Sequence, residues 1–271
     1  MHTSSRLVFI LPVFKNVLIR RFSVSGRNTR FNLPLYSKGA PESQSYLLSR
    51  SSSIFELQTH RVKPKYLADY LKYLEEFSKA FSGLASQARI QSRLLGSWTC
   101  EIGEQNTAYH LWEFPDGYPC FAKCQTMLAD NETLLAFKQK RDRMLSSFQN
   151  QLCLPFSFWP NPEPRTEGKN VYELRSYTLK PGTMIEWGNH WIRGLRLRSR
   201  NQEAVAGLFS HIGEMHVVHH LWAYTSLEAR SKSRDQTWQV NGWNECVMNT
   251  VPLIRHMTSS ILRPTSTSLL Q

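Results

Sequence analysis

Apolar residues in the first part of the chain change from a spacing of two to a helical spacing, which predicts a series of short elements. Residues 54–62 alternate as a strand and lead into Pro64, which suits the first turn of a helix. The stripe that follows at helical spacing is Leu67, Tyr70, Leu71, Leu74, Phe77 and Phe81. The other elements predicted here are strands at about 93–102 and 106–114, a helical region from Gly117 to about Phe148 with a break near Asp130-Asn131, and a closing strand at 152–159.

The same order of elements returns beyond a stiff, Pro-rich linker at 161–170. The predicted elements are a strand at 171–179, a helix with the apolar stripe Met184, Trp187, Trp191 and Leu195, strands at about 204–212 and 215–224, a helix from roughly 227 to 247, and a strand at 255–263. The order β-α-β-β-α-β is ferredoxin-like, with helices on one face of an antiparallel sheet. We therefore predict an α+β protein of two tandem ferredoxin-like units, residues 53–160 and 171–271, whose sheets pack face to face.

Two stretches of the chain repeat each other, which indicates an internal duplication. The matched pairs, each 110 residues apart, are Gly103 and Gly213, Glu104 and Glu214, His110 and His220, and Trp112 and Trp222. Phe55-Glu56-Leu57 likewise matches Tyr172-Glu173-Leu174, at an offset of 117 residues. In the second copy, aromatic and β-branched residues run up to a turn at Gly213-Glu214 and away from it, which predicts a hairpin.

The composition is that of a globular chain with a basic surface. Of the 271 residues 41% are hydrophobic, enough for a sizeable core, and the formal net charge is +12. A basic balance suits nucleic acid, anionic lipid or an acidic partner, and equally an ordinary protein of a basic compartment. The five cysteines include no C-x-x-C pair, so we expect reduced thiols and neither a disulfide framework nor a zinc site.

The N-terminal stretch is basic, and its first acidic residue is Glu42. Serines and apolar residues fill the spaces between its lysines and arginines, a composition typical of a mitochondrial transit peptide. The apolar run from Leu7 to Ile19 is too short to span a bilayer, and no A-x-A-like site indicates a secretory signal. We therefore expect residues 1–22 to direct the chain to the mitochondrial matrix and residues 23–52 to be disordered.

Several unbroken runs in both halves carry the pattern of a known family. They are Gly117-Tyr118-Pro119, Tyr172 to Tyr177 with Lys180-Pro181-Gly182, Met184 to Asn189, Val217 to Tyr224 and Val251 to Met257. Over about residues 53 to 271 the chain resembles the NipSnap family. The resemblance implies two dimeric α/β-barrel-type domains fused in one chain, residence in the mitochondrion, and a role in mitophagy signalling and trafficking. It also implies autophagy adaptors and mitochondrial proteins as partners, and a homodimer or a heterodimer with a paralogue. It brings no agreed catalytic residues.

Strand alternation gathers polar groups of the second half on one face. The alternate face, with Tyr172, Leu174 and Thr178, is expected to meet the helices. The residues expected to line a cavity between the two sheets are Glu173, Arg175, Tyr177, His220 and Trp222. Such a cavity suits a small polar ligand or proton transfer. Charged groups inside a barrel commonly pair with one another, and this is the interpretation we favour.

The histidines near the second hairpin do not predict a metal site. They are His211, His216, His219 and His220. His219 and His220 are adjacent in sequence and so point to opposite faces of a strand, while His211 lies across a turn from His216. We expect neither a metal nor another cofactor.

Two basic clusters lie on predicted helices. One contains Arg193, Arg196, Arg198 and Arg200, and the other contains Lys138, Lys140, Arg141 and Arg143. Cations late in a helix complement its dipole, so a solvated face is the simpler interpretation. The alternative is weak association of the Arg193 cluster with anionic head groups of the inner membrane. Nucleic acid is not expected, because neither RRM aromatics nor a helix-turn-helix pattern is visible.

The function expected from these patterns is that of a non-enzymatic mitochondrial matrix interaction protein in quality control. The alternative, from fold analogy alone, is a small-molecule-binding or monooxygenase-like dimeric α/β-barrel enzyme that uses the inter-sheet cavity. A closed cavity of roughly several hundred cubic ångströms lined by the polar groups would favour a ligand or catalysis. A packed seam between the sheets would favour the interaction role.

Overall fold

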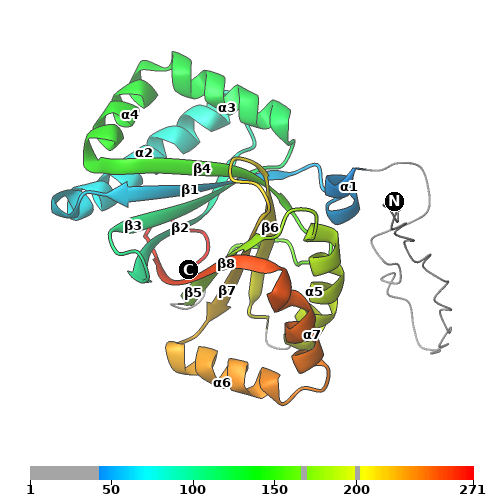
Figure 1. Ribbon diagram of the computed structural model, residues 1–271. Helices are drawn as coiled ribbons and strands as arrows, with labels where there is room; N and C mark the ends of the chain where they lie inside the picture. Colours follow the sequence, from blue (N-terminus) through cyan, green and yellow to red (C-terminus); the bar gives the residue numbers. More distant parts are fainter. Residues whose placement is uncertain (1–42, 166–169, 199–201) are drawn as a thin grey trace, which may run out of the picture. The chain divides into compact units, whose positions relative to one another are not determined.

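The computed structural model describes residues 43–165, 170–198 and 202–271 (Figure 1). The predicted transit peptide and most of the segment predicted to be disordered lie outside these ranges. The end of that segment is ordered, contrary to the prediction: α1 (Gln44–Leu48) begins after Ser43, whose side chain accepts a hydrogen bond from the Tyr46 amide. Leu48 is only 1% exposed and packs in the same apolar cluster as Phe156, a tertiary contact that local composition does not reveal.

The first unit has the predicted β-α-β-β-α-β order. Its elements are β1 (Ile54–Val62), η1 (Pro64–Tyr66), α2 (Leu67–Gln87), β2 (Arg93–Ile102), β3 (Thr107–Phe114), α3 (Tyr118–Asp130), α4 (Glu132–Met144) and β4 (Leu145–Pro155). The predicted break between the two helices is confirmed, because the Asn131 side chain caps α4 by accepting from the Leu134 amide. β4 begins earlier than predicted, since residues from Leu145 onward pair with β1 instead of extending α4.

The second unit repeats this order. Its elements are β5 (Val171–Leu179), α5 (Met184–Arg198), β6 (Ala204–Ile212), β7 (Val217–Tyr224), α6 (Leu227–Trp238), α7 (Trp243–Thr250), η3 (Val251–Leu253) and β8 (Ile254–Pro264). The single helix predicted over 227–247 is two helices. Gly242 lies between them with a φ of 91°, in the left-handed region that glycine enters without strain. Gly213, at the predicted hairpin turn between β6 and β7, also has a positive φ, of 106°.

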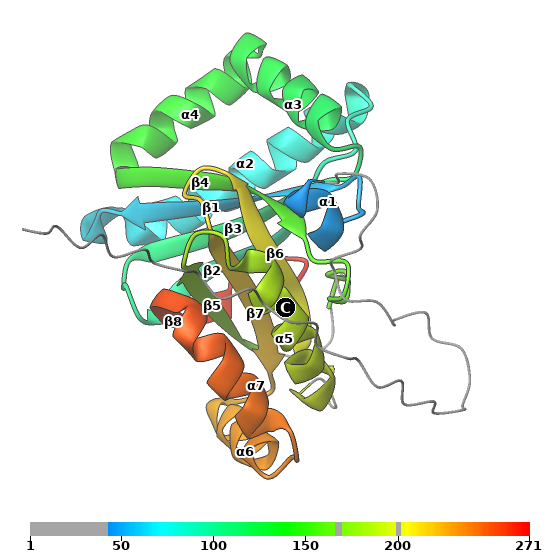
Figure 2. The same cartoon turned by 45° about the vertical axis from the view of Figure 1, so that its right-hand side comes forward.

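The two sheets join into one closed antiparallel barrel of eight strands within the described ranges (Figures 1 and 2). Within the units the strand orders are β4-β1-β3-β2 and β8-β5-β7-β6, the ferredoxin-like order in both. The joints are short: residues 98–102 of β2 pair with 261–264 of β8, and residues 152–155 of β4 pair with 208–212 of β6. The prediction of two tandem ferredoxin-like units is confirmed.

The helices cover the outer faces of the barrel. α2, α3 and α4 lie over the first sheet, and α5, α6 and α7 lie beside the second (Figure 1). The first set contributes Phe81 and Cys124 to a cluster with Trp112 of β3. The second set contributes Trp187 and Trp191 to a larger cluster with strand residues. No helix in the described ranges is long and apolar enough to cross a membrane.

The barrel interior is filled by apolar side chains from both sheets. Trp98 and Leu262 meet Tyr172 and Leu174 there, and all four are buried. The space left among these side chains is about 10 Å³, close to what a single water molecule needs. The seam between the two sheets is therefore a packed core.

Candidate functional site

The predicted pocket residues come together, but not between the two sheets. β5 carries Glu173, Arg175 and Tyr177 on one face, and the register with β7 places Trp222 opposite Glu173 and His220 opposite Arg175. This face packs against the helices outside the barrel, in the cluster that contains Trp187 and Trp191 of α5.

The predicted inter-sheet cavity is therefore wrong, and so is the prediction that Tyr172 and Leu174 meet the helices. Alternation separates two faces of a strand without indicating which one is inside. A closed barrel fills its interior with large apolar side chains, whereas the surrounding helices bring arginines that can pair with a buried acid.

Glu173 is the centre of the site and is fully buried. Its Oε1 accepts hydrogen bonds from Arg175 Nη1 at 2.8 Å, Arg230 Nη2 at 2.7 Å and Ser259 Oγ at 2.7 Å. Its Oε2 accepts from Arg230 Nε at 2.9 Å. Burial alone would raise the pKa of this carboxyl, but the bonds and charges of Arg230 and Arg175 lower it to about 2. At neutral pH the carboxylate is ionised, and its oxygens are occupied.

His220 lies among aromatic rings and is also fully buried. Its ring centroid is 4.4 Å from that of Trp159 and 4.8 Å from that of Trp191, in stacked geometry, and 5.1 Å from that of Tyr177. Neither ring nitrogen has a hydrogen-bond partner in the described part of the chain. Burial lowers the pKa of His220 well below its usual range. The imidazole is therefore neutral, and this geometry makes it a packing group rather than a general base.

The neighbouring histidine faces the other way, as strand alternation predicts. His219 lines the barrel interior, where its Nε2 is 2.7 Å from Gln151 Oε1 and its Nδ1 is 2.8 Å from Ser176 Oγ. Across the described ranges, no group of three or more His, Cys, Asp or Glu side chains is placed to hold one metal ion.

A cavity of about 210 Å³ opens beside Arg175, between the sheet and α5, α6 and α7. Arg198 lines it and is 5% exposed, with its Nη2 donating to Tyr224 Oη at 2.7 Å and its guanidinium 3.8 Å from the centroid of Trp222. Arg234 also lines it, and no carboxylate in the described ranges forms an ion pair with it. The four arginines here are Arg175, Arg198, Arg230 and Arg234, against the carboxylates of Glu173 and Glu203. The site therefore carries excess positive charge.

The predicted anionic-lipid patch on α5 does not form one surface. Arg193 and Arg196 are exposed, but Arg198 is buried in the site just described. Residues three apart share a helix face, whereas residue 198 lies on the opposite side from both. The prediction is wrong for Arg198, and Arg200 lies outside the described residues.

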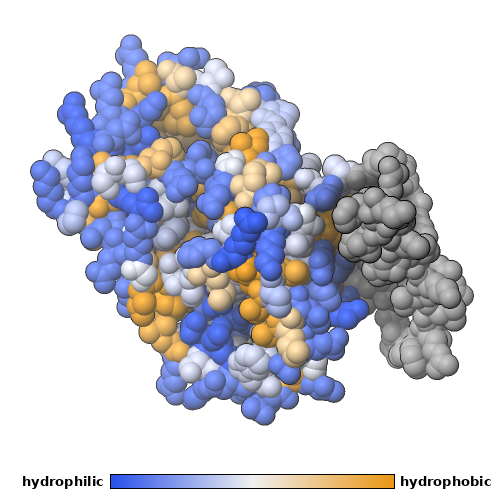
Figure 3. Space-filling view, viewed as in Figure 1, coloured by the Kyte–Doolittle hydropathy of each residue, from blue (hydrophilic) through white to orange (hydrophobic). Residues whose placement is uncertain are grey.

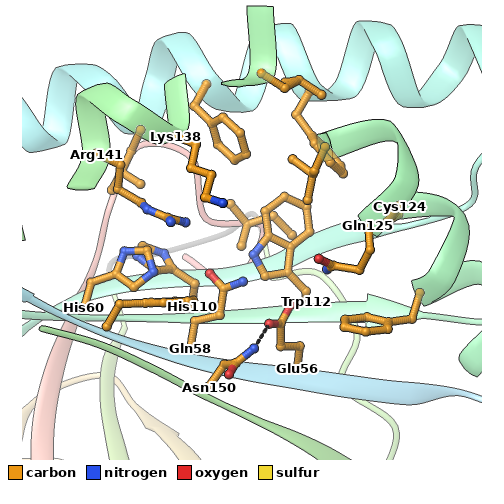
Figure 4. A pocket seen from close by; sticks show the side chains of 18 of the residues that line it. Glu56, Gln58, His60, His110, Trp112, Cys124, Gln125, Lys138, Arg141 and Asn150 are labelled. Atoms are coloured by element: carbon orange, nitrogen blue, oxygen red, sulfur yellow. Dashed lines mark hydrogen bonds between the residues drawn. The ribbon is translucent and has the colours of Figure 1, made fainter. Parts of the chain in front are cut away.

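The duplication produces a second site on the first sheet (Figure 4). In β1 and β3 the residues at the equivalent places are Glu56, Gln58, His60, His110 and Trp112. The register is the same, with Glu56 opposite Trp112 and Gln58 opposite His110. These residues line a cavity of about 290 Å³ beneath α2, α3 and α4.

The two equivalent carboxyl groups differ in charge environment. Glu56 is 4% exposed, and its Oε1 accepts from Asn150 Nδ2 at 2.5 Å, with no arginine in contact among the described residues. Burial raises the pKa of Glu56, whereas that of Glu173 is lowered. The match of Phe55-Glu56-Leu57 to the second copy contained the signal for this site, although we did not predict it. No sequence signal pointed to Arg230 or Arg234, because their helix approaches β5 only in the folded chain.

Solved structures share this architecture. A candidate monooxygenase from Fusobacterium nucleatum aligns over 80% of this chain and 94% of its own, with a TM-score of 0.61 and 11% identity. An anthrone oxidase-like protein aligns over 80% and 93%, with a TM-score of 0.54 and 12% identity. At such identities the likeness shows the fold alone.

Sequence comparisons identify the family. NipSnap homolog 1 of Danio rerio is 46% identical over 232 residues, which cover 85% of this chain and 82% of that protein. NipSnap homolog 2 of Homo sapiens is 45% identical over 85% of this chain and 80% of its own length. The NIPSNAP family model matches residues 55–160 and 172–269, one match for each ferredoxin-like unit. The chain therefore belongs to the NipSnap family.

Proposed function

We propose that this chain is a mitochondrial matrix protein that binds other proteins in mitochondrial quality control and does not catalyse a reaction. Mitophagy signalling, recruitment of autophagy adaptors and vesicular trafficking are the processes in which it acts. Its partners are autophagy adaptors, mitochondrial proteins, and a second copy of the chain or a paralogue.

The observation that carries this proposal is the packing of the barrel interior. The seam between the units holds about 10 Å³ of space, so the inter-sheet chamber that the alternative, an enzyme, would use is filled with side chains such as Trp98 and Tyr172. Two units that share one packed core form a rigid body, and a rigid body suits the presentation of an outer surface to partners. The basic stretch before Glu42 supports the mitochondrial location.

Affinity capture of the full chain from intact and from depolarised mitochondria tests the proposal. We expect the protein of intact mitochondria to be protected from added protease and to co-purify with mitochondrial proteins. After depolarisation we expect autophagy adaptors to co-purify as well. A protected protein that captures no adaptor after depolarisation contradicts the quality-control role, and a protein found outside mitochondria contradicts the location.

A second candidate function is the binding of a small anion by the site on the second sheet. The excess of arginines around Glu173 favours it, because the partly buried Arg234 has no ion-pair partner among the described residues and an anion would supply one. A reaction is not proposed there, since Glu173 is fully occupied and His220 lacks a partner. Titration with inorganic phosphate tests it: we expect Arg234→Gln to weaken binding about tenfold. Equal binding by the variant, or no binding by either protein, contradicts this function.

A further inference from the structure

The cavity beneath α2, α3 and α4 has an apolar end and a polar end. Phe81 and Trp112 meet at its apolar end, with ring centroids 4.8 Å apart, and Phe121 packs edge-to-face against Phe114 at 5.2 Å. Apolar residues also show at the surface between α3 and α4 (Figure 3). This end suits a hydrocarbon chain or an aromatic ring.

The polar end is bounded by two cations from α4. Lys138 and Arg141 extend from the helix toward the sheet, on the side of the cavity where His60 and His110 lie (Figure 4). Arg141 Nη2 contacts its sequence neighbour Asp142 at 2.8 Å, whose carboxylate is half exposed. In the described part of the chain Lys138 has no ion-pair partner.

No carboxylate inside the cavity neutralises these cations. Among the described residues Glu56 is the one acid that lines it; this carboxyl is buried, and its Oε1 accepts from Asn150 Nδ2 rather than from either cation. Two cations thus face one acid at this end: Lys138 has no ion-pair partner in the described residues, and Arg141 is paired only with the half-exposed Asp142, so an anion there would meet excess positive charge.

A chain of hydrogen bonds runs from Thr265 to this end, and in one direction it places a further donor there. Thr265 Oγ1 donates to Ser97 Oγ at 2.8 Å, which leaves the Ser97 proton for His110 Nδ1 at 3.0 Å. His110 Nε2 then donates to Tyr70 Oη at 2.8 Å, and Tyr70 donates to His60 Nδ1 at 2.5 Å. In this direction each proton of the chain has one acceptor.

This series of hydrogen bonds ends in an N–H group of the cavity wall that has no acceptor among the described residues. With His60 Nδ1 accepting, its proton is on Nε2, which is buried and has no partner in the described residues. Burial lowers the pKa of His60 well below its usual range and that of His110 to about 3, so both rings are neutral, as the chain requires. His60 is 3% exposed, and a buried donor without an acceptor is unfavourable unless a ligand supplies one.

We propose that this cavity binds a small amphipathic monocarboxylate, with its apolar body among Phe81, Phe121 and Trp112 and its carboxylate between Lys138, Arg141 and the Nε2–H group of His60. A carboxylate provides one negative charge and two acceptor oxygens, which suits two cations and one neutral donor.

The size of the cavity limits the ligand. Its volume of about 290 Å³ is at the lower end of the range of roughly 300–1,000 Å³ that small-molecule pockets have. An acid of about a dozen non-hydrogen atoms, such as an arylalkanoate or a medium-chain fatty acid, fits this space. For a ligand of that size we expect a Kd between about 10 μM and 1 mM.

Calorimetric titration of the full chain with 4-phenylbutyrate tests the proposal. We expect saturable binding to one site. Lys138→Gln and Arg141→Gln should each weaken it about tenfold, and His60→Phe, which keeps a ring but removes the N–H group, about threefold or more. The neutral isostere 4-phenylbutan-1-ol should bind at least about tenfold more weakly.

Two matched variants locate the site. Lys140→Gln removes a cation of α4 that pairs with Glu76 outside the cavity, and Arg234→Gln alters the second-sheet site; we expect neither to change the affinity for 4-phenylbutyrate. Because Lys138 and Lys140 are exposed, we expect both variants to keep the thermal midpoint of the native protein, which would show that the fold is intact.

Three results would overturn the proposal. They are no binding up to about 5 mM, equal binding of the alcohol, and an affinity that falls with Arg234→Gln or Lys140→Gln as much as with Lys138→Gln. Each of these leaves the proposed role in protein binding untouched, because that role depends on partners and not on this cavity.

Discussion

Replacement of Glu173 by Gln removes the one anion that Arg175 and Arg230 share while keeping the shape of the side chain. Folding lowers the pKa of Glu173 from 4.5 to about 2. At about 1.4 kcal/mol for each pKa unit, this shift corresponds to about 3 kcal/mol of stability at neutral pH. The Gln amide would also place a donor beside Arg230. We therefore expect Glu173→Gln to lower the free energy of unfolding by about 3 kcal/mol and the melting temperature by roughly 6–12 °C.

The pH dependence has a definite sign. A carboxyl group whose pKa is lowered by folding stabilises the native state fully above its unfolded pKa, and this contribution is lost as the pH falls toward the folded pKa. The stability gap between the native protein and Glu173→Gln should therefore be constant from pH 8 to about pH 6. Below the unfolded pKa of 4.5 it should shrink, toward the folded value of about 2.

Glu56→Gln is the matched control, because it makes the same change at the equivalent place in the other unit. Burial raises the pKa of Glu56, so its ionisation opposes folding as the pH rises through the folded pKa. We expect Glu56→Gln to leave the free energy of unfolding unchanged or to raise it at pH 7. Near pH 4 the difference in this free energy between the variant and the native protein should disappear. Urea unfolding followed by tryptophan fluorescence measures the free energy of unfolding of both variants. Equal losses of stability in the two variants would refute the contrast between the two sites.

Three further predictions concern targeting, packing and the shared barrel. Arg20→Glu with Arg21→Glu should block import, since import depends on the positive charge of the segment; normal matrix delivery in cell fractionation would contradict this. Gly207→Ala should destabilise the protein by about 2 kcal/mol, because the new Cβ would lie 2.3 Å from the Trp159 ring, whereas Gly83→Ala on α2, with nothing within 4 Å, should be neutral or stabilising in urea unfolding. Residues 53–161 and 166–271 expressed separately should aggregate, self-pair or stay molten, and co-expression should recover one complex in gel filtration. Two halves that unfold as stable monomers would show independent domains.

The elements of the fold could be predicted because their patterns are local. The alternation in 54–62 and the stripe from Leu67 to Phe81 are determined by sequence spacing, and both appear as predicted. Errors occur where a distant contact overrides local preference. Residues 145–151 are strand because β1 lies beside them, and Leu48 is ordered because a core cluster receives it.

The residues that form the site could be predicted, but the face of the sheet on which they lie could not. Spacing grouped Glu173, Arg175, Tyr177, His220 and Trp222 correctly on one face. It did not indicate that this face is the outer one, because the interior is defined only when both sheets close. Arg230, which together with Arg175 keeps Glu173 ionised, comes from α6, whose sequence shows no sign of that contact.

Fusion of the two units in one chain has a consequence for how such a protein changes over generations. In a symmetric dimer of single-unit chains, each codon specifies the same residue at both sites, so any substitution is made twice. Here the two positions can be altered separately. One now holds a carboxyl group in contact with an amide, Glu56 with Asn150, and the other holds a carboxylate between two guanidinium groups, Glu173 with Arg175 and Arg230. Because β4 and β5 are linked covalently, a substitution that stabilises one unit need not alter the other. One unit can therefore keep a buried ion network while the site of the other unit changes toward binding a ligand.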